Sequence, residues 1–181
     1  MQFETFDSSK EEKNVEKFIY KYIQRQQFQE LDNLLRATRD KVEITTIYDK
    51  SGYTPIHYAA YKNIEKAVEI IIRFILSEDD DKTHAFVNGG SGETDGVHIN
   101  ESSLRTKKEE RKAKLKGWIN SISLGDDGFT ALHFASFHGN MQMIKLLVKH
   151  GANIHAQNKQ GINMLHVAAQ GDAPVSMGYF L

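Results

Sequence analysis

Apolar residues recur at spacings of three and four in several separate segments, which is the pattern of amphipathic helices. Residues 14–23 and 28–35 are predicted to form two helices with a polar break at 24–27. The same spacing returns at residues 65–76 and again at 143–148. Since these segments are short and separated by turn residues, the pattern predicts an all-α fold built from helical hairpins.

Residues 42–48, VEITTIY, interrupt the helical pattern. Their β-branched, partly alternating composition is typical of a strand when taken alone. A turn follows directly at residues 48–52, where Gly52 supplies a positive φ without steric cost. We therefore interpret 42–48 as an extended arm leading into that turn.

An internal repeat begins at residue 126. Residues 126–154 contain a turn, a short helix, a break and a second helix. Gly128 and His133 both recur at one common offset, as Gly161 and His166. Self-similarity at a fixed period of about 33 residues is the signature of a solenoid of helix-turn-helix units.

Residues 53–60, YTPIHYAA, resemble the T-P-L-H-x-A-A core of ankyrin repeats. Thr54 is a good N-cap, because its hydroxyl can accept a hydrogen bond from an unpaired backbone N–H. Pro55 suits the first helical turn, and His57 can bridge polar backbone groups at the helix start and the adjacent turn. The resemblance implies an all-α ankyrin-repeat solenoid of stacked helix-turn-helix units with a long polar insertion.

The resemblance implies a division of the chain into six parts. They are a flexible lead-in at 1–13, an N-terminal helical cap or degenerate repeat at 14–47, a repeat at 48–76, a charged insertion at 77–116, a repeat at 117–157 and a truncated repeat at 158–181. Terminal repeats commonly diverge, which favours the cap. The period places residues 179–181 inside the last second helix, so we expect a piece of a longer protein.

The insertion explains why the period of about 33 residues is not kept between His57 and His133. The interval from His57 to His133 exceeds two periods and is not a multiple of one. Residues 77–116 begin with the acidic run 78–81 and end in the mainly basic segment 104–116. This composition is typical of a solvated, largely disordered loop with a short polar helix. A degenerate repeat and a partner-contacting or charge-regulated insertion remain as alternatives.

Composition and charge exclude several classes of protein. The chain has no cysteine, which excludes a disulfide scaffold, a thiol nucleophile and a cysteine zinc site. A formal net charge of −1 offers no basic surface for nucleic acid, and no apolar run approaches the roughly 18 residues of a membrane span. We expect a cytoplasmic, monomeric unit that does not insert into a membrane.

Histidine is the most suggestive residue type for chemistry, with eight in the chain. His57, His133 and His166 occupy equivalent positions and are therefore spread one repeat apart, whereas a metal needs converging ligands. Structural hydrogen bonding is favoured for them. The chain also lacks a phosphate loop and a G-x-S-x-G elbow, so no metal, no cofactor and no catalytic residue is expected.

The remaining candidate site is a surface that could bind another protein. By the resemblance, the turn tips and the inner faces of the first helices line a groove for another protein. The tip positions are Tyr48, Lys50, Asp126, Asp127, Lys159 and Gln160, and the first-helix positions are Tyr58, Tyr61, Phe134, Phe137, His138 and Gln170. Rings provide large contact area at low entropic cost. An equal alternative is that Tyr58 and Phe134 pack between repeats.

A second function of a different class comes from residues 162–181, which contain A-A-Q-G. This unit is similar to the ankyrin heads of DHHC-type palmitoyltransferases, in which the head recruits substrate proteins to a membrane-bound catalytic domain. The resemblance implies a location on the cytoplasmic face of a membrane. None of the Asp-His-His-Cys motif is present here, so the chain itself would perform no acyl transfer.

Overall fold

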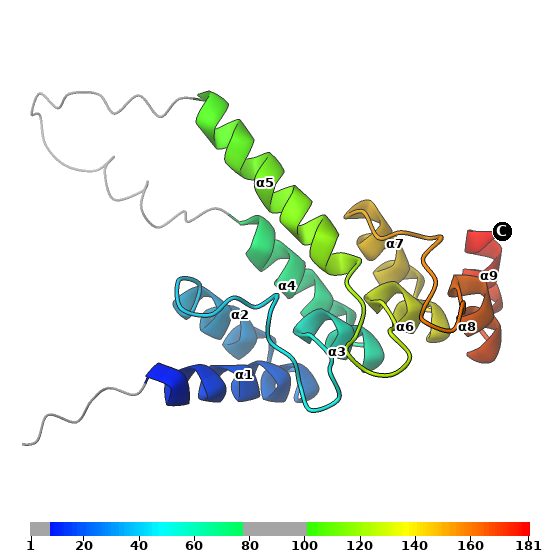
Figure 1. Ribbon diagram of the computed structural model, residues 1–181, viewed down its shortest axis with the longest axis horizontal. Helices are drawn as coiled ribbons and strands as arrows, with labels where there is room; N and C mark the ends of the chain where they lie inside the picture. Colours follow the sequence, from blue (N-terminus) through cyan, green and yellow to red (C-terminus); the bar gives the residue numbers. More distant parts are fainter. Residues whose placement is uncertain (1–7, 78–100) are drawn as a thin grey trace, which may run out of the picture.

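The computed structural model describes residues 8–77 and 101–181, with side chains described for 14–77 and 105–181. Within these ranges all regular structure is helical (Figure 1). The helices are α1 Ser8–Gln24, α2 Phe28–Ala37, α3 Pro55–Tyr61, α4 Glu65–Leu76, α5 Glu101–Ile119, α6 Ala131–Phe137, α7 Met141–Lys149, α8 Met164–Gln170 and α9 Pro174–Phe180.

Eight of these helices form four consecutive hairpins. The first helices α1, α3, α6 and α8 pack on one another in that order, and the second helices α2, α4 and α7 form a parallel outer row. The hairpins lie side by side along the long axis of the molecule (Figure 1). This arrangement confirms the predicted all-α solenoid.

Helices α3, α6 and α8 begin where the sequence predicts, although their caps differ. Asn163 accepts hydrogen bonds from the backbone N–H groups of Leu165 and His166 and so caps α8 in the usual way. The Thr54 hydroxyl instead pairs with Nδ1 of His57 at 2.8 Å. The prediction of a backbone cap at Thr54 is therefore wrong, because the histidine ring occupies the hydroxyl.

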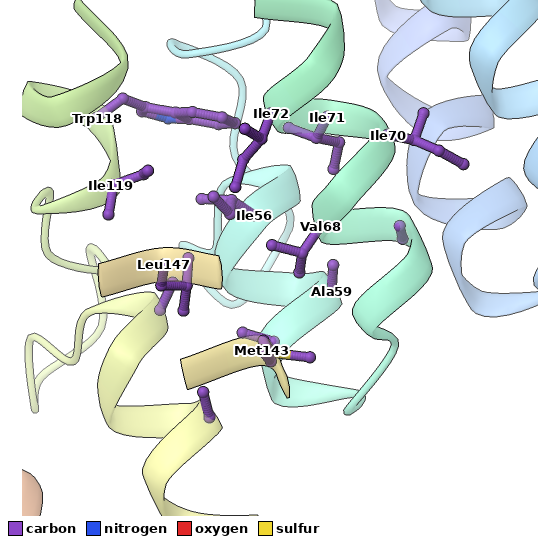
Figure 2. Close-up of a cluster of buried hydrophobic side chains, with 14 of the residues drawn as sticks. Ile56, Ala59, Val68, Ile70, Ile71, Ile72, Trp118, Ile119, Met143 and Leu147 are labelled. Atoms are coloured by element: carbon purple, nitrogen blue, oxygen red, sulfur yellow. The ribbon is translucent and has the colours of Figure 1, made fainter. Parts of the chain in front are cut away.

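One continuous apolar core runs through the hairpins. Figure 2 shows its centre, where side chains of α3 and α4 meet those of α7 and of the end of α5. The fully buried side chains there include Ile56, Ala59, Val68, Ile71, Met143 and Leu147. Small residues such as Ala59 let α3 and its neighbours approach closely, which explains why each of α3, α6 and α8 has two consecutive small residues near its end.

Helix α1 is longer than the sequence pattern indicates. It begins at Ser8, so the predicted lead-in at 1–13 is wrong for residues 8–13, while residues 1–7 lie outside the described range. The Tyr20 hydroxyl donates to the Tyr53 carbonyl at 2.7 Å. Burial, with the Asp49 carboxylate nearby, raises the pKa of this phenol. Tyr20 thereby joins the first hairpin to the second.

The arm between α2 and α3 contains turns and no strand. Hydrogen bonds from Lys41 to Thr38 and from Thr46 to Glu43 fold it locally. Ile44 and Ile47 are buried in the core. The extended conformation expected for 42–48 is therefore wrong at residues 44–46, which form a turn, and the buried isoleucines of the arm pack into the core.

Helix α5 differs most from the sequence-based expectation. It lies alongside α4 and runs in the opposite direction (Figure 1). Its exposed, charged residues lead to a buried end at Leu115, Trp118 and Ile119. The short polar helix expected within the insertion is therefore present but longer than expected, and largely disordered structure is wrong for residues 101–116. Residues 78–100 lie outside the described range.

The degenerate-repeat alternative describes α5 only in part. Helix α3 packs directly on α6, so α5 is an added outer helix without a first-helix partner. Immediately after α5 the chain returns to the repeat register, since the side chain of Asn120 bonds both Gly151 O and Asn153 N. Within the described residues, neither α5 nor any other helix is long and apolar enough to cross a bilayer.

Candidate functional site

The inner row of helices encloses a groove of ≈ 390 Å³. It extends from the end of α3 across α6 to α8, and the turn before α6 forms one rim. The lining residues are Tyr61, Asp127, Phe129, His133, Phe134, Phe137, His138, Ile162, Val167 and Gln170. Three hairpins contribute, so this groove exists only because the repeats are stacked.

Phe134 is the centre of an aromatic cluster on the groove wall. Its ring lies 5.3 Å from the Tyr53 ring, 5.7 Å from Tyr61 and 5.7 Å from Phe129, between centroids. These pairs are edge-to-face, a geometry that aromatic quadrupoles favour. The cluster spans two hairpins and fixes the rings at steep angles to one another.

Polar contacts hold α3 and α6 in register at the same end of the groove. Nε2 of His138 lies 2.8 Å from the Tyr61 carbonyl, to which it donates. Beside it, the Asn140 amide donates to Oδ1 of Asn63 at 2.8 Å. Between α6 and α8 no side chain intervenes at the corresponding position, because Gly171 lies directly against the Phe137 carbonyl. The groove wall is therefore rigid along its length.

The buried histidines are structural. His57 uses Nδ1 for Thr54 and Nε2 for the Ser121 carbonyl at 2.9 Å. His133 repeats this arrangement with Thr130 and with the Ile162 carbonyl at 3.1 Å. Each ring thus ties its hairpin to the next one, as predicted.

Burial sets the protonation of these rings. It lowers the pKa of His57 to about 4, although the hydrogen bond to Ser121 opposes the change. Burial also lowers the pKa of His133, against the hydrogen bond to Ile162. Both rings are therefore neutral at neutral pH. Among the described residues no group of three or more His, Cys, Asp or Glu side chains could hold a metal ion.

The turn tips of the last two hairpins contact each other. The Lys159 ammonium donates to the Gly125 carbonyl at 2.9 Å. The Gln160 amide donates to the Asp126 carbonyl and to Oδ1 of Asp127, both at 3.3 Å. Lys159 and Gln160 therefore stabilise the stacking of the tips.

The twelve site residues proposed from the sequence divide evenly. Those that line the groove are Tyr61, Asp127, Phe134, Phe137, His138 and Gln170. Those that do not are Tyr48, Lys50, Tyr58, Asp126, Lys159 and Gln160. Tyr58 packs edge-to-face on Tyr20 at 5.3 Å, so the packing alternative describes it. Phe134 does both, since it packs between repeats and also lines the groove.

Four lining residues were not among the predicted site residues, namely Phe129, His133, Ile162 and Val167. Phe129 and Ile162 precede the cap of α6 and of α8, respectively, at positions one period apart. The recurrence of an apolar residue just before each cap could therefore have identified Phe129 and Ile162 from the sequence. Their half-buried side chains extend the apolar floor of the groove.

Comparison with known proteins gives a family match within the regular unit. The family "Ankyrin repeat" matches residues 127–159. Notch-regulated ankyrin repeat-containing protein A of Danio rerio is 48% identical over 53 residues, covering 29% of this chain and 47% of that protein. Ankyrin repeat and SOCS box protein 3 of Bos taurus is 32% identical over 169 residues, covering 76% of this chain and 31% of that protein.

The chain thus spans less than half the length of these relatives. Neither is a DHHC-type palmitoyltransferase, so the likeness of residues 162–181 to that family gains no support.

Among solved structures, a chain in the crystal structure of the yeast ribosomal protein Rps3 in complex with its chaperone Yar1 aligns with a TM-score of 0.62 and 19% identity, covering 97% of this chain and 93% of that chain. The chain therefore carries an ankyrin repeat at residues 127–159 and folds as an ankyrin-repeat solenoid.

Proposed function

We propose that this chain is a non-catalytic protein-interaction unit of a larger protein, and that it binds a segment of a partner polypeptide in the groove along α3, α6 and α8. The observation that carries the proposal is the exposure of aromatic side chains in a concave surface. Tyr61 is 44% exposed and Phe137 is 41% exposed, and both line the groove. Exposed rings in a groove are typical anchors of protein interfaces.

The rigidity of the wall supports the same function. His138 and Asn140 fix the end of α6 to the end of α3, and Gly171 fixes α8 against α6. A preformed surface pays less conformational entropy when it binds. The aromatic anchors are therefore held in place before a partner arrives.

The lining residues favour binding over chemistry. They include no serine, cysteine or lysine that could act as a nucleophile. The buried histidine among them, His133, has both ring nitrogens engaged with protein groups. A proton-transfer role for His133 would require one of those nitrogens to be released from the hairpin junction.

The test is partner capture with two matched double variants. Tyr61→Ala with Phe137→Ala removes two exposed rings from the groove. Phe18→Ala with Tyr179→Ala removes two rings of similar exposure, 38% and 40%, from α1 and α9, which do not line the groove. We expect at least a ten-fold loss of affinity for the partner in the groove variant, because buried aromatic anchors each contribute about 2 kcal/mol or more.

Quantitative mass spectrometry of proteins captured from cell extract supplies the partner, and titration with the purified partner supplies the affinity. Circular dichroism confirms that both variants are folded. The proposal fails if the control variant loses as much affinity as the groove variant, or if neither loses any.

A further inference from the structure

The groove combines aromatic rings with a single charged group. Four of its ten lining residues are Tyr61, Phe129, Phe134 and Phe137. Neighbouring rings stand steeply to one another, with Phe134 at 73° to Tyr61 and at 63° to Phe129. Perpendicular rings form the walls of a corner, where a ligand can meet one ring face while touching the edge of the next.

Asp127 is the only Asp, Glu, Lys or Arg among these lining residues. Its carboxylate is exposed and receives one hydrogen bond on Oδ1, from Gln160. It also affects its surroundings: burial raises the pKa of the Tyr53 phenol within the cluster, and Tyr61, Asp49 and Asp127 add to this in that order. The charged side chain among the lining residues is therefore an anion, and the rings beside it are neutral.

Two lysines near the groove have printed contacts with groups other than the Asp127 carboxylate. Lys159 donates to the Gly125 carbonyl. Lys62 lies at the end of α3, with Nζ 4.9 Å from the centroid of Tyr61 and 5.7 Å from that of Tyr58. Lys62 thus makes a cation–π contact with Tyr61, which lines the groove, and electron-rich ring faces favour such contacts in general.

We propose that the groove holds a cationic side chain of the partner polypeptide, an arginine, with its guanidinium against the aromatic wall and paired with Asp127. This inference rests on the function proposed above and specifies the chemistry that the groove recognises. Arginine fits better than lysine because its planar group stacks on aromatic faces and offers two parallel donors to one carboxylate. An apolar side chain fits less well, since it would take water from Asp127 without replacing its hydrogen bonds.

The test uses small probes and NMR on the whole chain. N-acetyl-arginine amide is titrated against N-acetyl-citrulline amide, which is nearly isosteric but neutral. We expect the arginine compound to shift the ring resonances of Phe129, Phe134 and Phe137 with saturation at millimolar concentration, and the citrulline compound to bind at least five-fold more weakly.

Two Asp-to-Asn variants test whether the charge of Asp127 contributes to arginine binding. Asp127→Asn keeps the acceptor for Gln160 and removes the charge. Asp126→Asn removes an exposed charge from the adjacent residue, which does not line the groove. We expect arginine binding to weaken about five-fold in Asp127→Asn, the order of one exposed ion pair, and to change less than two-fold in Asp126→Asn.

Equal binding of the arginine and citrulline compounds would overturn the inference, as would equal effects of the two variants or shifts confined to residues outside the groove. The proposed function has a separate readout. If the partner is lost from Tyr61→Ala with Phe137→Ala but binds Asp127→Asn normally, the groove binds a polypeptide and only the arginine assignment is wrong.

Discussion

Replacing Gly171 by alanine should destabilise the protein by about 3 kcal/mol, the upper range for overpacking a well-packed site. A Cβ built at this position would lie 2.7 Å from the carbonyl carbon of Phe137 and closer still to its oxygen. Both are backbone atoms at the end of α6, so no side-chain rotation can relieve the clash. The last hairpin would have to move away from the rest of the solenoid.

The control is Gly178→Ala in α9, where a Cβ would meet nothing within 4 Å. This variant should be neutral or more stable by up to about 1 kcal/mol, because alanine favours helix more than glycine does. Urea unfolding monitored by circular dichroism measures both. Equal midpoints for Gly171→Ala and the wild type would show that α8 does not approach α6 as closely as described.

Lowering the pH from 7 to 5 should cost about 2 kcal/mol of stability through His57 alone, since each unit of pKa difference between folded and unfolded states is a free-energy difference. The ordinary pKa is 6.5, and burial lowers the pKa of His57 in the folded protein to about 4. Below pH 6.5 the unfolded chain binds a proton that the folded chain excludes. This contribution is therefore complete above pH 6.5 and is lost as the pH falls toward 4. Burial of His133 acts in the same direction.

His57→Gln isolates the effect. The variant is expected to be less stable than the wild type at pH 7, because the bonds to Thr54 and Ser121 are disturbed, but to lose about 2 kcal/mol less between pH 7 and 5. His155→Gln changes an exposed histidine and serves as the control. Parallel pH profiles for His57→Gln and the wild type would contradict a buried, neutral His57.

Much of the fold follows from periodicity. The common spacing of Gly128 with Gly161 and of His133 with His166 places both hairpins correctly, because each repeat must bury the same face against its neighbours. Helix α4 was predicted with its observed bounds. The structural role of His57 follows from its position three residues after Thr54, within reach of the next turn.

Helix α5 was not predictable in this way. It has no apolar stripe along most of its length, and its contacts with the core come from Leu115, Trp118 and Ile119 at its end. When only the last turn of a helix packs against the core, the rest of the helix keeps the charged composition of a solvated segment. Composition therefore does not distinguish the two. Pairing with α4 is a tertiary effect that no local pattern encodes.

The groove could be predicted only in part for a similar reason. Tyr61, Phe137 and Gln170 lie at exposed first-helix positions that the repeat register identifies. Lys159 and Gln160 also lie at exposed positions, but they reach back to the preceding tip. Register indicates which residues face outward, whereas the partner of a long side chain depends on the spacing between neighbouring hairpins.

The most direct measurement of the central claim is site-specific photo-crosslinking to the captured partner. The photoreactive amino acid p-benzoylphenylalanine is placed at position 137 in the groove or, as a control, at position 18 on α1. The account predicts a cross-link to one partner segment from position 137 and none from position 18. A partner that cross-links from position 18 and not from 137 would show that the polypeptide binds elsewhere on the solenoid.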